Sequence, residues 1–242
     1  MERIGYKVLI VIGVLSLIMI SLIPPIQQSQ TYHHFSDNNA FFYIPNFWNV
    51  ISNIPFVIIG FLGLYKLKGI KKENLQYASF FIGVILVGFG SGYYHLNPND
   101  TSLVWDRLPM TIVFMSLVSI IISEFISYKK GRYLLFPMLV LGILSIVYWI
   151  VFNDLRPYVI IQFYPMLAIP IILIFFKSMY NKTFGYWLLL FTYIIAKFFE
   201  YFDSEIFTFL GVVSRHSLKH IISAFGIFVL HYMYIKRQKL IE

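Results

Sequence analysis

Five residues with reactive side chains fall in two short stretches of the chain. The stretch SGYYHLNPNDTSLVWDRLPM begins with Ser91, places His95 four residues later and Asp106 eleven residues after that. The stretch RHSLKH holds His216 and His220, again four residues apart. Histidine nitrogens can bind a metal ion, and the serine and the aspartate would add further polar groups to such a site.

The four-residue spacings decide how these side chains are presented. Residues four apart lie on the same face of an α-helix, so Ser91 shares a face with His95, and His216 shares one with His220. Three histidines and one open position form a common catalytic zinc site. Spacing alone leaves the alternative open that each histidine is an ordinary solvated or hydrogen-bonded side chain.

Composition places these residues in a membrane protein. Of the 242 residues, 59% are hydrophobic and only 12% are charged, against about 25% charged in soluble domains. The chain has no cysteine, so disulfides and thiolate metal ligands are excluded. The net charge of +8 is typical of basic cytoplasmic loops and does not by itself indicate nucleic acid binding.

Apolar stretches of about 20 residues, the length that crosses a bilayer as a helix, recur along the whole chain. They favour an all-α integral membrane protein over a β-barrel, whose strands alternate in polarity. The first could be a signal peptide, but no small-residue cleavage site follows it, which favours an uncleaved helix. The eight predicted segments are Lys7–Ile23, Phe47–Tyr65, Tyr77–Leu96, Leu108–Ile126, Tyr133–Phe152, Tyr158–Phe176, Phe184–Phe202 and His216–Ile235.

The basic residues predict the orientation of these segments. Fourteen of the nineteen lysines and arginines fall on one side if every segment spans the membrane. The positive-inside rule then predicts a multi-pass cell-membrane protein with both termini in the cytoplasm. His95, Asp106 and His216 would all lie at the outer ends of their segments, and the site would therefore be near the outer face. Gly88, Gly90 and Gly92 would let another backbone approach Ser91 closely.

Four motifs in this order resemble the alkaline ceramidase family, within the superfamily that also holds the adiponectin and progestin receptors. They are NFWNVISNIPF (46–56), SGYYH (91–95), WDRLPM (105–110) and HSLKH (216–220). The resemblance implies a seven-helix transmembrane domain over residues 32–235. Residues 1–31 would then be an additional N-terminal transmembrane helix with the start of an outer loop, and residues 236–242 a basic cytoplasmic tail. Richness in Ile, Lys, Asn and Phe suggests a bacterial-type member.

The resemblance also implies roles for the five residues. His95, His216 and His220 match the family's zinc ligands. Asp106 matches the aspartate that acts on the water at the zinc, and Ser91 matches the serine that helps to hold the carbonyl oxygen. The implied activity is zinc-dependent hydrolysis of membrane lipid amides, ceramide-like N-acyl sphingoid lipids, to a fatty acid and a long-chain base.

A calcium site is a further implication, with one departure from the family pattern. The animal enzymes carry a calcium-binding glutamate directly before the FWN motif, where this chain has Asn46. Asp37 and Asn46 remain the two candidate ligands, since calcium prefers oxygen ligands. His33 and His34, in the same stretch, are expected to be solvated loop residues.

Other functions stay open at this point. A receptor-like or regulatory protein with a structural zinc, a zinc-dependent phospholipid esterase and a transporter would all be rich in membrane helices. A transporter predicts polar residues near the middle of the bilayer, whereas the polar residues here gather at one face. Arg107 and Arg215, which flank Asp106 and His216, either bind lipid headgroups or mark the outer interface. Neither the oligomeric state nor the exact lipid follows from the sequence.

Overall fold

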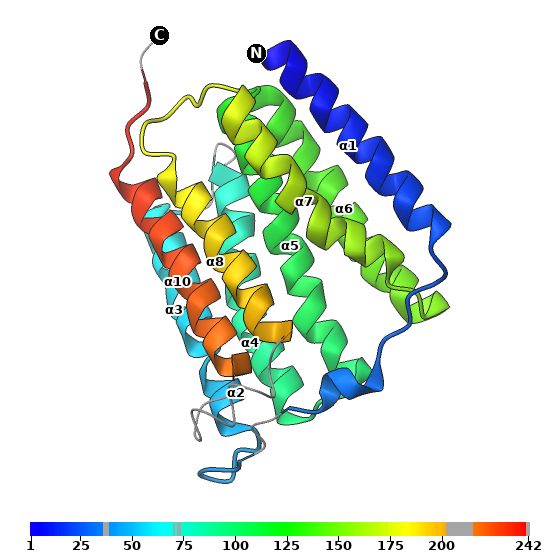
Figure 1. The fold of residues 1–242 in the computed structure, drawn as a ribbon. Helices are drawn as coiled ribbons and strands as arrows, with labels where there is room; N and C mark the ends of the chain where they lie inside the picture. The colour runs from blue at the N-terminus through cyan, green and yellow to red at the C-terminus, as the bar shows by residue number, and fades with distance from the viewer. Residues whose placement is uncertain (36–38, 70, 72–73, 202–214, 241–242) are drawn as a thin grey trace.

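The structure, a computed structural model, describes residues 1–35, 39–69, 71, 74–201 and 215–240. These residues form a helical bundle without any β-strand, and α1 begins at the end of the bundle where α10 finishes (Figure 1). The helices are α1 (Glu2–Leu22), the 3-10 helix η1 (Gln30–His33), α2 (Phe47–Ile51), α3 (Ile54–Lys66), α4 (Leu75–Leu96), α5 (Asp100–Phe125), α6 (Tyr128–Phe152), α7 (Arg156–Phe175), α8 (Phe184–Tyr201) and α10 (Arg215–Lys236).

The predicted all-α membrane architecture is confirmed. In the described part of the chain, seven spans are long and apolar enough to cross a membrane, with α2 and α3 counted as one. An eighth apolar helix, within α8, is slightly shorter. Large apolar side chains cover the outer surface, among them Phe136, Leu141 and Ile150 of α6. Such a surface fits lipid, because water would not tolerate so much exposed apolar area.

The helix α5 is the most buried of the spans and lies in the interior of the bundle (Figure 1). It packs against α4, α6 and α7. Thr111, Ser116 and Ser119 on α5 are fully buried, and small residues of this kind let membrane helices approach one another closely. The central position of α5 matters for function because this helix carries Asp106.

Two segments differ from the predicted bounds for identifiable reasons. Helix α5 starts at Asp100, eight residues before the predicted start, because Asn99 and Ser102 form a reciprocal capping box. Asp106 therefore lies inside the helix and not at its mouth. The second predicted segment is broken into α2 and α3 at Ser52, because Pro55 cannot donate a backbone hydrogen bond to the preceding turn.

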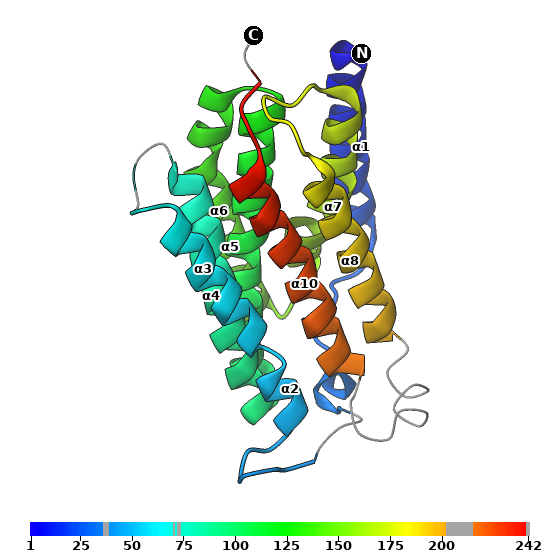
Figure 2. The ribbon, with the colours of Figure 1, turned by 90° about the vertical axis from the view of Figure 1, so that its left-hand side faces the viewer.

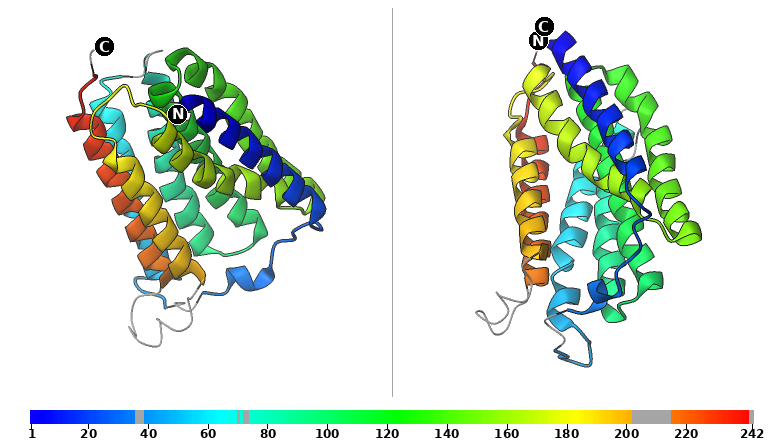
Figure 3. Two further views of the ribbon diagram at one scale, coloured as in Figure 1. Left: turned by 45° about the horizontal axis from the view of Figure 1, so that its top comes forward. Right: turned by 45° about the vertical axis from the view of Figure 1, so that its right-hand side comes forward.

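The additional helix α1 lies on the outside of the bundle against α7 (Figure 3). The turn between α6 and α7 holds its far end: Asp154 accepts hydrogen bonds from the backbone N–H of Ile26 and from Arg156. Arg156 also donates to the carbonyl of Ile23. Burial raises the pKa of Asp154, but these hydrogen bonds outweigh it and lower that pKa below its ordinary value.

A polar network closes the opposite side of the bundle, near the chain ends. The buried carboxylate of Glu124 on α5 accepts hydrogen bonds from Tyr186 of α8 at 2.8 Å and from Arg237, just after α10, at 2.6 Å. Helix α10 lies between α3 and α8 (Figure 2). The network thus joins α5, α8 and α10 at the end of the bundle away from the histidines.

Candidate metal centre

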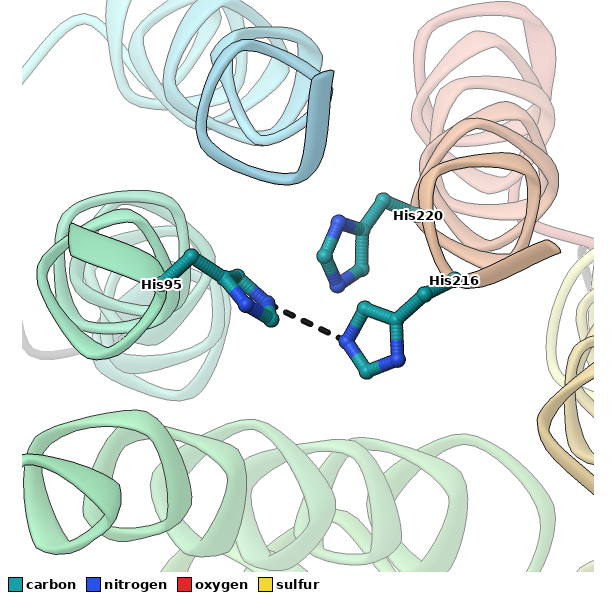
Figure 4. Close-up of side chains that lie close together, drawn as sticks. All are labelled: His95, His216 and His220. Carbon is teal, nitrogen blue, oxygen red and sulfur yellow. Dashed lines mark hydrogen bonds between the residues drawn. The ribbon is translucent and has the colours of Figure 1, made fainter. Parts of the chain in front are cut away.

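Three histidines from two helices converge at one end of the bundle. His95 is the last residue but one of α4, and His216 and His220 lie in the first two turns of α10. All three are buried, and their rings point toward one another (Figure 4). One ring nitrogen from each lies within 4.8 Å of the others, a spacing that could hold a metal ion. We call these residues the histidine cluster.

Within the histidine cluster, the closest approach joins the two helices. Nε2 of His216 lies 3.1 Å from Nε2 of His95. Nδ1 of His95 is buried and makes no hydrogen bond to any part of the chain that the structure describes. A buried polar atom without a partner is costly. The histidine cluster therefore contains a nitrogen, Nδ1 of His95, whose bonding capacity the described residues leave unused.

The third histidine is oriented by the short helix α2. Ser52 donates a hydrogen bond to the carbonyl of Asn49 at 3.1 Å, and its Oγ lies 2.8 Å from Nδ1 of His220. When Ser52 keeps its proton on the carbonyl of Asn49, Nδ1 of His220 is the donor in this second bond. The Nε2 of His220 is then unprotonated and can bind a metal, as a hydrogen bond to the other nitrogen commonly ensures in metal sites.

The same short helix ties both sides of the centre together. The buried side chain of Asn49 accepts a hydrogen bond from Ser217, which lies between the two histidines of α10. Asn46, in a left-handed conformation at the start of α2, donates its side-chain N–H to the carbonyl of His95 at 2.8 Å. The NFWNVISN motif thus holds α4 and α10 in register. The sequence alone did not reveal this structural role of the motif.

A pocket of about 360 Å³ adjoins the histidine cluster. Ser91, Asp106 and His220 line it, so the serine and the aspartate predicted from the sequence share one space with one of the three histidines. Farther along, the pocket wall is apolar and includes Leu117 and Ile227. A volume of this size lies in the range of small-molecule sites, and its apolar wall suits a lipid chain.

Glycines let α4 pack closely against α5 and α3. A Cβ atom on Gly90 would overlap the carbonyl oxygen of Trp105, and one on Gly88 would collide with Val57. The predicted close approach is therefore confirmed at these two positions. At Gly92 a Cβ would meet nothing within 4 Å, so the prediction is wrong there.

The segment after α1 covers the centre. Phe35 packs its ring 4.8 Å from that of His95 and 4.7 Å from that of His216. His33 is hydrogen-bonded to Tyr94 at 2.9 Å and to Asp100 at 3.0 Å, with its side chain only 8% exposed. It is therefore a packed residue, contrary to expectation.

The structure describes His34 and one of the two candidate calcium ligands. His34 is exposed, as a loop residue should be. Asp37, the first candidate calcium ligand, lies outside the described residues. Asn46, the second, is described and uses its amide nitrogen on His95.

Comparison with known proteins identifies one family. The model of that family, Ceramidase, matches residues 36–188, more than half of the chain. No curated protein matches the chain. The matched region contains His95 and Asp106 but ends before α10, and the fold itself brings His216 and His220 to the matched part. The chain belongs to the Ceramidase family.

Proposed function

We propose that this protein is a zinc-dependent hydrolase of membrane lipid amides, which cleaves ceramide-like N-acyl sphingoid lipids to a fatty acid and a long-chain base. One observation carries the proposal: a cluster of three buried histidines adjoins a largely apolar pocket of about 360 Å³ that Ser91 and Asp106 also line. Membership of the Ceramidase family supports the amide bond of a ceramide as the bond that is cleaved.

The histidine cluster fits zinc. Two nitrogens held at about 2.0–2.1 Å from one tetrahedral ion lie roughly 3.3 Å apart. The 3.1 Å between Nε2 of His95 and Nε2 of His216 is close to this distance. Three neutral nitrogen donors and no thiolate are typical of a zinc site that retains an open position for catalysis.

When bound, zinc supplies Lewis-acid chemistry, which makes water a nucleophile at neutral pH and polarises a carbonyl. Asp106 accepts a proton from the attacking water and later delivers it to the nitrogen of the leaving amine. The water oxygen forms a bond to the carbonyl carbon, the C–N bond breaks, and the products are a carboxylic acid and an amine. Ser91 donates a hydrogen bond to the oxyanion that develops. No covalent intermediate on Ser91 is required.

The lipid enters from the membrane in this proposal, with its acyl chain along the apolar part of the pocket. Burial of a chain against residues such as Leu117 and Ile227 contributes about 0.8 kcal/mol for each methylene group. That free energy would hold the amide in reach of Ser91 and Asp106, which lie at the polar part of the same pocket.

We also propose that both termini are cytoplasmic and that the site is near the outer face. The start of α1 and the end of α10 lie at one end of the bundle, together with the basic turns from α5 to α6 and from α7 to α8 (Figure 1). The start of α10, which holds His216 and His220, lies at the other end. A reporter that works only in the cytoplasm should be active when it is fused at the C-terminus. A reporter that works only outside the cytoplasm should be active when it is inserted between α1 and α2. The reverse result would place the site at the inner face.

A calcium site at Asp37 and Asn46 stays a prediction. The amide oxygen of Asn46 is the atom that would bind the cation, since its nitrogen donates to His95. Calcium would then stabilise the segment that covers the histidine cluster. Its effect is measured as a rise in melting temperature on addition of calcium to the purified protein, compared with the same amount of magnesium.

The decisive experiment is metal analysis and turnover on the same purified sample. We expect about one zinc per chain and release of fatty acid from an N-acyl sphingoid lipid, lost on chelation and restored by zinc. Bound zinc without turnover of any amide would favour a receptor-like protein with a structural metal. Turnover of phospholipid esters but not amides would favour an esterase, and absence of zinc would end the proposal.

A further inference from the structure

Arg107 is a buried cation on the wall of the lipid pocket. It follows Asp106 directly on α5, is only 8% exposed and lines the same pocket as Ser91. The proposed hydrolysis assigns it no role. A guanidinium is always charged at physiological pH, so its positive charge is present inside the membrane-embedded part of the protein.

Aromatic rings surround the guanidinium of Arg107. Its Cζ lies 4.7 Å from the ring centre of Trp149, 5.2 Å from that of Tyr158 and 5.5 Å from that of Tyr32. Its Nη1 is buried and makes no hydrogen bond within the described part of the chain. The ion pairs found among the described residues do not include Arg107.

Arg237 provides an internal comparison. Its side chain is 9% exposed and also lies over three aromatic rings, those of Tyr77, Tyr180 and Tyr234. Unlike Arg107, it has a carboxylate partner, Glu124, at 2.6 Å. Arg237 is thus neutralised by a carboxylate of the protein, whereas the described residues offer the guanidinium of Arg107 aromatic faces alone, which compensate a buried charge incompletely.

The lining of the pocket combines Arg107 with an apolar wall. The apolar wall suits a lipid chain, and Arg107 directly follows Asp106 on α5 and lines the same pocket as Ser91. An anion carried at the polar end of a lipid would therefore reach the guanidinium while the chain occupies the apolar part.

We propose that Arg107 binds a negatively charged oxygen group, a carboxylate or a phosphate, at the polar end of the lipid that occupies this pocket. Guanidinium forms paired, charge-assisted hydrogen bonds with such groups. Two sources share this chemistry: an anionic headgroup on the lipid amide substrate, and the carboxylate of the fatty acid released from it. The identification of these two sources rests on the proposed hydrolysis, whereas the binding of an anionic oxygen group by Arg107 does not depend on it.

The test measures equilibrium binding to the purified full chain, without turnover. Two lipid pairs separate the two sources: an N-acyl sphingoid lipid with and without a headgroup phosphate, and a long-chain fatty acid with its primary amide. We expect the protein to bind at least one anionic member about 10- to 100-fold more tightly than its neutral partner, as for hydrogen bonds to charged groups. The pair that shows the preference identifies the source.

Variants assign the preference to Arg107. Arg107→Gln should abolish it and leave the neutral lipids' affinity unchanged, while Arg107→Lys should retain part of it. Arg132→Gln is the matched control, because Arg132 also lies over a tyrosine ring, that of Tyr128, but does not line this pocket. It should leave the preference intact.

Two outcomes would overturn the proposal. One is a wild-type protein that binds both members of each pair equally, a result that needs no variant to fold. The other is an Arg107→Gln protein that keeps the full preference. Absence of hydrolysis in the wild type with the preference present would refute the hydrolase and leave the anion site standing, so the two proposals fail separately.

Discussion

Nε2 of His95 and Nε2 of His216 lie 3.1 Å apart, although 121 residues separate them in the chain. The contact joins the last turn of α4 to the first turn of α10, and α2 bridges the two helices through Asn46 and Asn49. The region that matches the Ceramidase family contains His95 but not His216. The histidine cluster is therefore a consequence of how the helices pack, and the first prediction depends on that packing.

Single alanine substitutions at His95, His216 and His220 should each remove most of the bound zinc, because a three-ligand site has no spare donor. Zinc content per chain, measured on detergent-purified protein, checks this expectation. His34→Ala and His231→Ala are the controls: His34 is exposed, and His231 packs at the edge of Phe81, outside the cluster. If His231→Ala lost as much zinc as His216→Ala, the ligand set would be wrong.

Asp106→Asn should retain most of the zinc and lose hydrolysis by about 100- to 10,000-fold, since it removes the general base without removing a ligand. Ser91→Ala should cost about 100- to 1,000-fold, the usual effect of removing one oxyanion donor. Both residues line the pocket, so neither change should unfold the protein. Zinc content and amide turnover are measured on the same samples.

Two results would contradict these roles. Complete loss of zinc in Asp106→Asn would make Asp106 a fourth ligand and favour a closed structural site. Full activity in both variants would end the mechanism.

Ser52→Ala should weaken zinc binding by about 10- to 100-fold, because Ser52 orients His220 through its Nδ1. The measurement is a zinc affinity titration with a competing chelator. Ser21→Ala is the matched control, since Ser21 also hydrogen-bonds a backbone carbonyl but lies exposed on α1. Unchanged affinity in Ser52→Ala would mean that packing alone positions His220.

Gly90→Ala should lower the melting temperature of the detergent-solubilised protein, because its Cβ has no room beside the carbonyl of Trp105. Overpacking of this kind costs about 1–3 kcal/mol. Gly92→Ala is the control in the same helix, where a Cβ meets nothing within 4 Å. It should leave stability unchanged or raise it by about 0.5–1 kcal/mol through helix propensity. Equal melting temperatures would disprove the close approach of α4 and α5.

The turn that holds α1 should be sensitive to acid. Hydrogen bonds from Arg156 and Ile26 lower the pKa of Asp154 despite its burial, so the carboxylate stabilises the fold above its ordinary pKa. This stabilisation should be lost as the pH falls through the lowered pKa, below about 3.9. Melting temperatures of wild type and Asp154→Asn should differ at pH 6 and converge toward pH 3. A constant difference across this range would contradict the assignment.

Much of the fold follows from the sequence because a bilayer imposes simple rules. A spanning helix must be continuously apolar over about 20 residues, so the spans could be located to within a few residues, as for α4 and α7. The larger differences between predicted and observed helix bounds also have local causes: the capping box at Asn99 lengthened α5, and Pro55 divided the second span. The i,i+4 spacing likewise predicts that His216 and His220 share one face of a helix.

Only the tertiary structure decided which faces meet. The bond between Ser52 and His220, the cover of Phe35 over His95 and the three rings around Arg107 join residues that are 40 or more positions apart. No local propensity encodes such contacts, since helix periodicity fixes the direction of a side chain relative to its own axis alone. The choice of neighbours depends on close packing between helices, here through Gly90 and the α2 break, and that packing determines whether five reactive residues become one site.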